Sequence, residues 1–226
     1  MSKYKIELSL QGVPVVSQFV DRPAEMAAVE QLLLEASPTT LSATPPATRR
    51  QRKVVVVHGL GGIGKTQLAV EFARKHHHRF SAVFWLDGSS EASLKQSFVD
   101  MVQRLPRSEL MANSAGQLSD AAVQADVAVR ECQRWLSIQS NPHWLLLIDN
   151  VDRDHHDRGD SQAYNVQAYF PHADHGSVLI TSRLASLQRL GLGVKVGTVA
   201  ADQSRAILEN NAGRVVKGKW KTIFGG

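Results

Sequence analysis

Hydrophobic residues in this chain gather in short uninterrupted runs that are separated by longer stretches of mixed polarity. Such runs occupy residues 53–58, 82–87 and 144–149; a shorter one occupies 177–181, and a less regular one occupies 194–199. A continuous apolar run of this length, rich in β-branched residues, is typical of a strand buried on both faces of a parallel sheet. The pattern therefore predicts five strands, the last of them the least regular.

Between these runs the apolar residues recur at helical spacing. We expect helices from residue 65 to about 77, over 91–105 and over 118–139, and a last one opened by Asp202. Strands that alternate with helices form right-handed crossovers around a parallel sheet. The predicted fold class is thus α/β, with a mainly parallel five-stranded sheet flanked by helices in three layers.

Composition changes along the chain and divides it into segments. We expect Asp21 to cap an early helix that has Pro23 in its first turn. The stretch rich in Ser, Thr and Pro that follows is typical of a flexible linker. The predicted segments are a leader at 1–16, a helical segment at 17–36, a flexible linker at 37–52, an α/β core at 53–212 and an irregular tail at 213–226.

The strongest motif is the loop between the first strand and the first core helix. Its sequence, Gly-Leu-Gly-Gly-Ile-Gly-Lys-Thr at residues 59–66, matches the phosphate-binding P-loop pattern. Bare main-chain amides must approach a phosphate closely, so glycine is needed for access and for positive φ. The glycines that serve this purpose are Gly59, Gly61, Gly62 and Gly64. The motif predicts a three-layer P-loop NTPase fold that binds ADP or ATP.

Two side chains at the end of the loop complete the predicted nucleotide site. Lys65 is expected to reach the β- and γ-phosphates as a point charge, next to the positive end of the helix. The hydroxyl of Thr66 is expected to bind Mg²⁺, a hard cation that prefers oxygen ligands. A glycine-rich turn without any ligand is the alternative, and the strand–loop–helix context disfavours it.

An acidic residue ends the third apolar run, where a metal-binding carboxylate is expected. We assign Asp149 to Mg²⁺, because P-loop proteins supply this carboxylate from a neighbouring strand. The next position is Asn150, which cannot accept a proton from an attacking water. Asp152 is a possible substitute. The sequence therefore predicts slow hydrolysis, which favours a switch over a motor.

The fourth run ends in Thr-Ser-Arg, which puts polar groups at the strand edge that faces the ligand in open α/β sheets. Arg183 is predicted to contact the γ-phosphate and report its presence. Pairing with a surface carboxylate is the alternative for this arginine.

Taken in order, these motifs resemble the NB-ARC family within the STAND class of P-loop NTPases, the nucleotide switch of NLR-type receptors and apoptotic scaffolds. The resemblance spans roughly residues 17–212, and the sequence Asp-Asn-x-Asp that begins at Asp149 is most similar to that of filamentous fungal members. Four segments carry it: Phe-Val-Asp-Arg at 19–22, the loop at 56–69, Phe-Trp-Leu-Asp at 84–87, and the pair 144–152 with 176–183.

The resemblance implies further site residues. Val20 and Arg22 would line the adenine pocket, although Asp21 replaces the family's usual glycine between them. Ile63 and Gln67, within and just after the loop, would join the nucleotide-binding set.

The resemblance also implies a function. The expectation is an ADP/ATP switch that signals in an immune or incompatibility response, through protein partners or self-oligomers. The family's Gly-Leu-Pro-Leu and Met-His-Asp motifs do not occur in this sequence. We therefore expect a module truncated after the nucleotide-binding subdomain, which binds nucleotide more weakly. Active ATPase, P-loop kinase and DNA-associated regulator stay open as alternatives.

The composition and charge of the chain limit which classes of partner and which cellular compartment are expected. A 226-residue chain that is 43% hydrophobic suffices for one sizeable core. The formal net charge of +5 is modest and scattered apart from residues 49–53, so nucleic acid is not expected as a partner. A single cysteine, Cys132, and the absence of a long apolar stretch predict a cytoplasmic protein without a membrane segment.

Histidines outside these motifs were considered as metal ligands. His76, His77 and His78 are consecutive, so they cannot share one helix face, and a helix end is the expected place. His155 and His156 lie among several aspartates, for which a solvated loop is the expectation.

Overall fold

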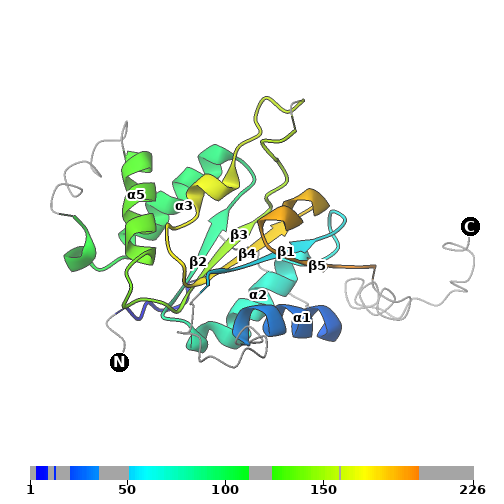
Figure 1. Cartoon of the computed structure of the whole chain (residues 1–226), viewed down its shortest axis with the longest axis horizontal. Helices are drawn as coiled ribbons and strands as arrows, with labels where there is room; N and C mark the ends of the chain where they lie inside the picture. Colours follow the sequence, from blue (N-terminus) through cyan, green and yellow to red (C-terminus); the bar gives the residue numbers. More distant parts are fainter. Residues whose placement is uncertain are drawn as a thin grey trace, which may run out of the picture.

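The computed structural model describes residues 4–9, 13, 21–35, 51–111, 124–157 and 159–198. At its centre lies a five-stranded sheet in the order β2-β3-β4-β1-β5, and the paired strands are parallel (Figure 1). The strands are β1 (Lys53–His58), β2 (Ala82–Asp87), β3 (Trp144–Asp149), β4 (Ser177–Ser182) and β5 (Leu192–Lys195). The predicted fold class and sheet are confirmed.

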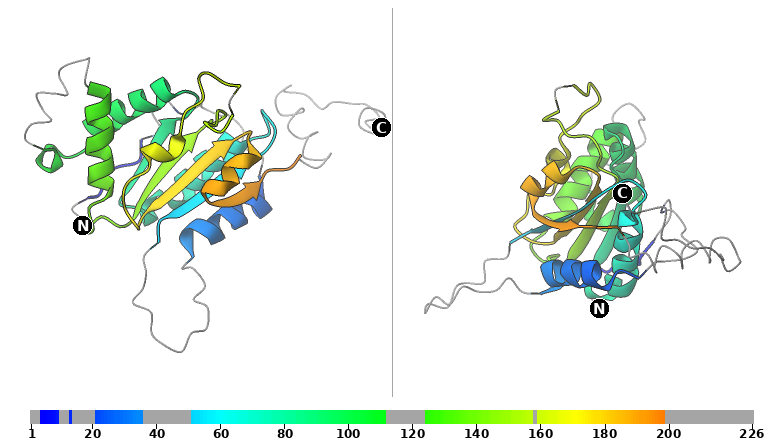
Figure 2. Two further views of the ribbon diagram at one scale, coloured as in Figure 1. Left: turned by 45° about the horizontal axis from the view of Figure 1, so that its top comes forward. Right: turned by 90° about the vertical axis from the view of Figure 1, so that its right-hand side faces the viewer.

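Helices cover both faces of the sheet, as Figure 2 shows from two sides. Helices α1 (Pro23–Leu34) and α2 (Lys65–His76) lie on one face, and α3 (Glu91–Gln103) and α5 (Gln124–Leu136) lie on the other. Short 3₁₀ turns occupy η1 (His77–Arg79), η2 (Arg107–Glu109), η3 (Val166–Tyr169) and η4 (Ala185–Leu190). The three predicted layers are therefore present.

The strands alternate their side chains between two apolar clusters. Val55 and Leu147 pack with α1 and α2, whereas Val56, Leu146 and Ile148 pack with α3 and α5. Because both faces are covered, every residue of β3 and β4 is buried, which explains their continuous apolar sequence.

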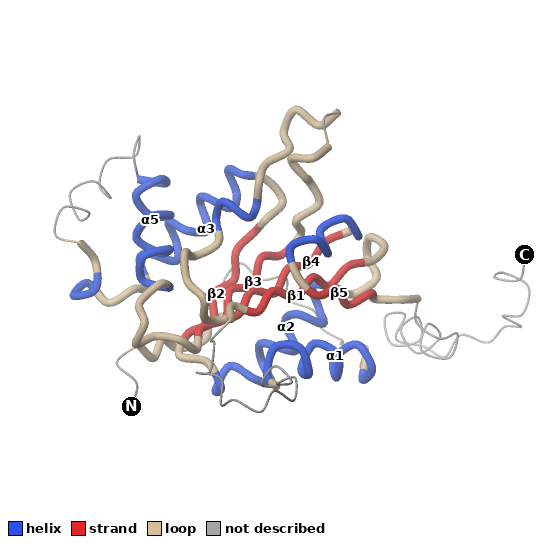
Figure 3. The backbone as a smooth tube through the Cα atoms, in the orientation of Figure 1, coloured by secondary structure: helices blue, strands red, loops and turns tan. Residues whose placement is uncertain are grey.

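Strand order decides what meets at the carboxyl edge of the sheet. β4 is inserted between β1 and β3, so the loop after β1 and the carboxyl end of β3 lie on either side of the end of β4 (Figure 3). A crevice of this kind, outside the carboxyl ends of parallel strands, is where α/β proteins bind ligands.

The N-terminal segment reaches the opposite edge of the sheet. The N–H of Ile6 donates to the carbonyl of Ser81 at 2.8 Å, next to the start of β2. The buried ring of Tyr4 meets Trp135 edge to face, with ring centroids 6.1 Å apart. Residues 4–9 of the predicted leader are therefore packed against the core.

Two local predictions are wrong. The fifth strand covers Leu192–Lys195 rather than 194–199, because an edge strand needs no unbroken apolar run and only Val194 of β5 is buried. Asp21 does not cap α1: Arg22 holds the N-cap position without a side-chain cap. Pro23 at N1 lacks an N–H, so the first turn of α1 has one fewer backbone donor for a side-chain cap to satisfy.

Helix ends differ slightly from the expected boundaries. α2, α3 and α5 end at His76, Gln103 and Leu136, each one to three residues before the predicted end. Residues 36–50, which hold most of the expected linker, lie outside the described residues, as do the helix expected after Asp202 and the tail. Arg52, at the linker's end, donates to the carbonyl of Ala173 at 3.3 Å. None of the helices in the described ranges is long and apolar enough to cross a membrane.

Candidate functional site: a glycine loop facing an acidic corner

The loop between β1 and α2 needs glycine where it starts and where it ends. At Gly59 φ is +153°, and a Cβ would lie 2.5 Å from the carbonyl oxygen of Val196. At Gly64, the N-cap of α2, φ is +98°. Gly62 also has a positive φ, as expected, whereas Gly61 does not. The loop therefore keeps bare amides at the positive end of α2, an arrangement suited to an anion.

Lys65, the first residue of α2, turns its side chain back into the loop. Its Nζ donates to the carbonyls of Gly59 at 3.0 Å and Leu60 at 2.8 Å. Burial lowers the pKa of this ammonium, an effect that Arg183 adds to and Asp152 opposes. The ammonium is thus held against carbonyls of the same loop that the motif assigns to a polyphosphate.

Thr66 and Asp149, the two side chains that the sequence analysis assigns to Mg²⁺, lie in direct contact. The Thr66 hydroxyl donates to Oδ1 of Asp149 at 2.9 Å, and the hydroxyl of Thr181 donates to the same oxygen. Burial raises the pKa of Asp149, and the two hydroxyl donors only partly offset it. An all-oxygen donor set with one carboxylate fits Mg²⁺, so these side chains are suited to hold the ion that P-loop proteins use.

Thr181 is a site residue that the sequence analysis did not single out. It is the next-to-last residue of β4, and its hydroxyl also accepts the N–H of Asn150 at 2.9 Å. The N–H of Val151 donates to the Thr181 carbonyl at 2.9 Å. In the sequence, the polar end of the fourth apolar run was the signal that could have identified Thr181 as a site residue. Only the sheet order, however, shows that its hydroxyl contacts Asp149.

Arg183 and Asp152 lie at the mouth of the site and contact each other. Oδ1 of Asp152 accepts the N–H of Arg183 at 2.6 Å, and Oδ2 accepts its Nε at 2.5 Å. The Arg183 side chain is 62% exposed. A Cβ on Gly61 would lie 3.5 Å from its Cδ. Arg183 therefore pairs with a carboxylate, as the alternative expected, and it lies beside the phosphate loop; its contact with a γ-phosphate stays a prediction.

Arg22 joins α1 to the underside of the loop. This buried guanidinium donates to the carbonyls of Ile63 at 2.7 Å and Gly197 at 2.9 Å, and it pairs with Glu25 at 3.1 Å. The side-chain oxygen of Gln67 lies near the end of the loop, 3.5 Å from where a Cβ on Gly64 would lie. Val20, the other expected adenine contact, lies outside the described residues.

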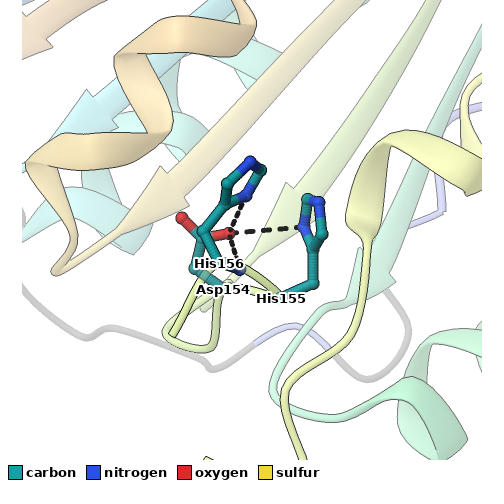
Figure 4. A group of neighbouring side chains, drawn as sticks. All are labelled: Asp154, His155 and His156. Atoms are coloured by element: carbon teal, nitrogen blue, oxygen red, sulfur yellow. Dashed lines mark hydrogen bonds and ion pairs between the residues drawn. The ribbon is translucent and has the colours of Figure 1, made fainter. Parts of the chain in front are cut away.

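The histidines that the sequence analysis set aside as metal ligands stand apart from this corner. Asp154, His155 and His156 cluster in the loop after β3, with both ring Nδ1 atoms turned toward Oδ1 of Asp154 at 3.3–3.4 Å (Figure 4). Arg189 donates to both oxygens of Asp154, at 2.6 and 2.7 Å. The carboxylate is therefore engaged in an ion pair. His76 ends α2, and the next two histidines lie in η1, the helix end predicted for them.

Comparison with known proteins agrees with this geometry. The family model described as NB-ARC domain matches residues 46–215. A nucleotide-binding leucine-rich repeat (NLR)-like protein of Hyaloscypha variabilis is 27% identical over 165 residues, which are 69% of this chain and 16% of that protein. The crystal structure of Cdc6p from Pyrobaculum aerophilum superposes with a TM-score of 0.51 and 11% identity, over 94% of this chain and 56% of that chain. The last likeness concerns the fold alone, and the chain spans only part of either protein.

Proposed function

This chain belongs to the NB-ARC domain family, and from that premise we propose that it is an ADP/ATP-binding switch that changes state by nucleotide exchange. The observation that carries the proposal is the convergence of the glycine loop, Lys65 and the Thr66–Asp149 pair at one corner of the sheet. Cationic, amide and metal-binding groups are thereby brought to the same place.

Each group has a distinct task in binding a nucleotide. The loop amides and the N-terminus of α2 accept the phosphate charge, and Lys65 adds a point charge beside them. When bound, Mg²⁺ would neutralise phosphate charge between Thr66 and Asp149. Arg22 keeps the loop in place from below through the carbonyl of Ile63.

A switch needs a contact that only one nucleotide makes. Arg183 suits this task, because it is exposed, borders the loop at Gly61 and is tied to Asp152. A γ-phosphate would compete with Asp152 for the guanidinium, so ATP and ADP would favour different arrangements of this pair. Only such a differential contact shifts a conformational equilibrium.

Hydrolysis in this scheme is slow and exchange dominates. Asn150 occupies the position after the metal-binding acid, and its amide takes up no proton. Because the matched relative is an NLR-like protein, we propose signalling of the NLR type, with a second copy or another protein as the downstream partner.

The binding site is tested by calorimetric titration of the full chain with ADP and with ATP, in the presence of Mg²⁺. Lys65→Ala is expected to weaken the affinity for either nucleotide at least ~100-fold, about 2.7 kcal/mol. Lys75→Ala is the matched control, since Lys75 lies on the same helix, is exposed and pairs with Glu30. Equal affinity of the wild type and Lys65→Ala would reject the site.

A further inference from the structure

A second carboxylate lies next to the metal-binding corner, on the strand beyond it. Asp87 ends β2 exactly as Asp149 ends β3, and the two residues are register partners in the parallel pair. Neighbouring strands are about 4.8 Å apart, so the two acids leave the sheet side by side. After burial, which is the main cause, the Asp87 charge helps to raise the pKa of Asp149.

The two acids share one cavity. A hollow of about 1280 Å³ is lined at one end by Thr66, Asp149 and Asn150, with Asp87 beside them. From there it extends along α3 past Ser93 and on to Asp100 and Arg104. Solvent therefore has room to reach the metal corner from the side on which Asp87 lies.

Asp87 is fixed in place while one of its oxygens stays available. Its Oδ1 accepts the N–H of Ser89 at 2.9 Å, and its own N–H donates to the hydroxyl of Ser97 at 3.0 Å. Within the described part of the chain, Oδ2 accepts no hydrogen bond, and the residue is exposed. An anchored carboxylate with one free oxygen is able to orient a water and take its proton.

The other candidates for this task are less suitable. Asn150 is an amide, held at φ +65° directly after Asp149. Asp152 has both oxygens occupied by Arg183. Of the carboxylates that border the metal corner in the described residues, Asp87 is the one that combines access to the cavity with a free acceptor.

We propose that Asp87 is the catalytic base of a slow ATP hydrolysis at this site, a role that rests on the proposed nucleotide binding. The water oxygen bonds to the γ-phosphorus as the bond from that phosphorus to the bridging oxygen breaks. The bridging electron pair leaves with ADP, and the water proton passes to the Asp87 carboxylate.

The test measures phosphate release by the full chain at saturating ATP and Mg²⁺, with ADP affinity measured in parallel. Asp87→Asn keeps an acceptor for Ser89 and is expected to lower the rate roughly 100-fold, with ADP affinity within twofold of the wild type. Asp100→Asn, in the same cavity on α3, is the matched control and should keep the wild-type rate. Lys65→Ala supplies the background rate.

A rescue variant separates catalysis from structural damage. Asn150→Asp added to Asp87→Asn places a carboxylate beside the same corner, at a φ that aspartate tolerates. This double variant should release phosphate at least tenfold faster than Asp87→Asn. Loss of ADP binding in the wild type would reject the nucleotide site itself. Where the wild type binds ADP normally, two results would overturn the role of Asp87 alone. One is that Asp87→Asn keeps the wild-type rate. The other is that the wild type releases no more phosphate than Lys65→Ala.

Discussion

Asp152 accepts both the main-chain N–H and the Nε of Arg183, at 2.6 and 2.5 Å. The two residues follow β3 and β4, so one ion pair connects the strand ends that flank the metal-binding corner. An ion pair exposed to solvent contributes little to stability. Its value here is positional, because it sets where the guanidinium lies relative to the loop.

Replacing the arginine should separate the two nucleotides. Arg183→Ala is expected to weaken ATP binding about tenfold, the equivalent of 1.4 kcal/mol, and to leave ADP binding within twofold. The reason is that only ATP offers a γ-phosphate to the guanidinium. Arg74→Ala, an exposed arginine on α2 paired with Glu71, is the control. Equal losses for ADP and ATP would show that Arg183 does not distinguish them.

Removing the Thr181 hydroxyl should loosen the metal-binding acid. Thr181→Val conserves shape but takes a donor from Asp149 and leaves the N–H of Asn150 without its acceptor. We expect a loss of about 1–3 kcal/mol in the free energy of unfolding, together with weaker Mg²⁺ dependence of ATP binding. Denaturant melts and metal titrations measure the two effects. Thr181→Ser keeps the hydroxyl, so weakened Mg²⁺ dependence in this variant would argue against the assignment.

Asp149 should favour metal binding at the expense of stability. Burial holds its folded-state pKa above the unfolded value. Its contribution to stability is therefore fully present below the unfolded pKa and is lost as the pH rises through the folded pKa. Without Mg²⁺ or nucleotide, Asp149→Asn is expected to raise Tm at neutral pH, since it removes a buried charge while keeping an acceptor for both hydroxyls.

The pH dependence provides the check on Asp149. The gain in Tm should shrink as the pH falls through the raised folded-state pKa of Asp149, and it should be gone below the ordinary range for an aspartate, where the wild-type carboxyl is neutral in both states. Asp100→Asn, at an exposed position, should show no such pH-dependent gain. A neutral-pH Tm of Asp149→Asn below that of the wild type would contradict the prediction.

Glycine at the start of the loop should be structurally required. Gly59→Ala would place a Cβ 2.5 Å from the carbonyl oxygen of Val196, at a φ of +153°. We expect a loss of about 1–3 kcal/mol, which lowers Tm by roughly 2–4 °C per kcal/mol in a chain of this size. Gly197→Ala is the control, because its Cβ would meet nothing within 4 Å. Similar thermal stability of both variants would mean that the loop relaxes freely.

Local sequence was sufficient for most of the architecture. The apolar runs place β1, β2 and β3 to the residue, because strands buried on both faces need an unbroken apolar sequence. The glycine spacing places the loop, and the acid that ends β3 is the residue that Thr66 contacts. The positions of these strands and of the loop each depend on residues that are neighbours along the chain.

Contacts between strand ends required the tertiary structure. Which side chains meet at the carboxyl edge depends on the order β2-β3-β4-β1-β5 and on its register, and no single segment encodes either. The hydroxyl of Thr181 on Asp149, the Arg183–Asp152 pair and the place of Asp87 beside Asp149 all follow from that order. The edge strand β5 was misplaced for a related reason: with one partner and little burial, its sequence is free to vary while long-range pairing with β1 sets its position.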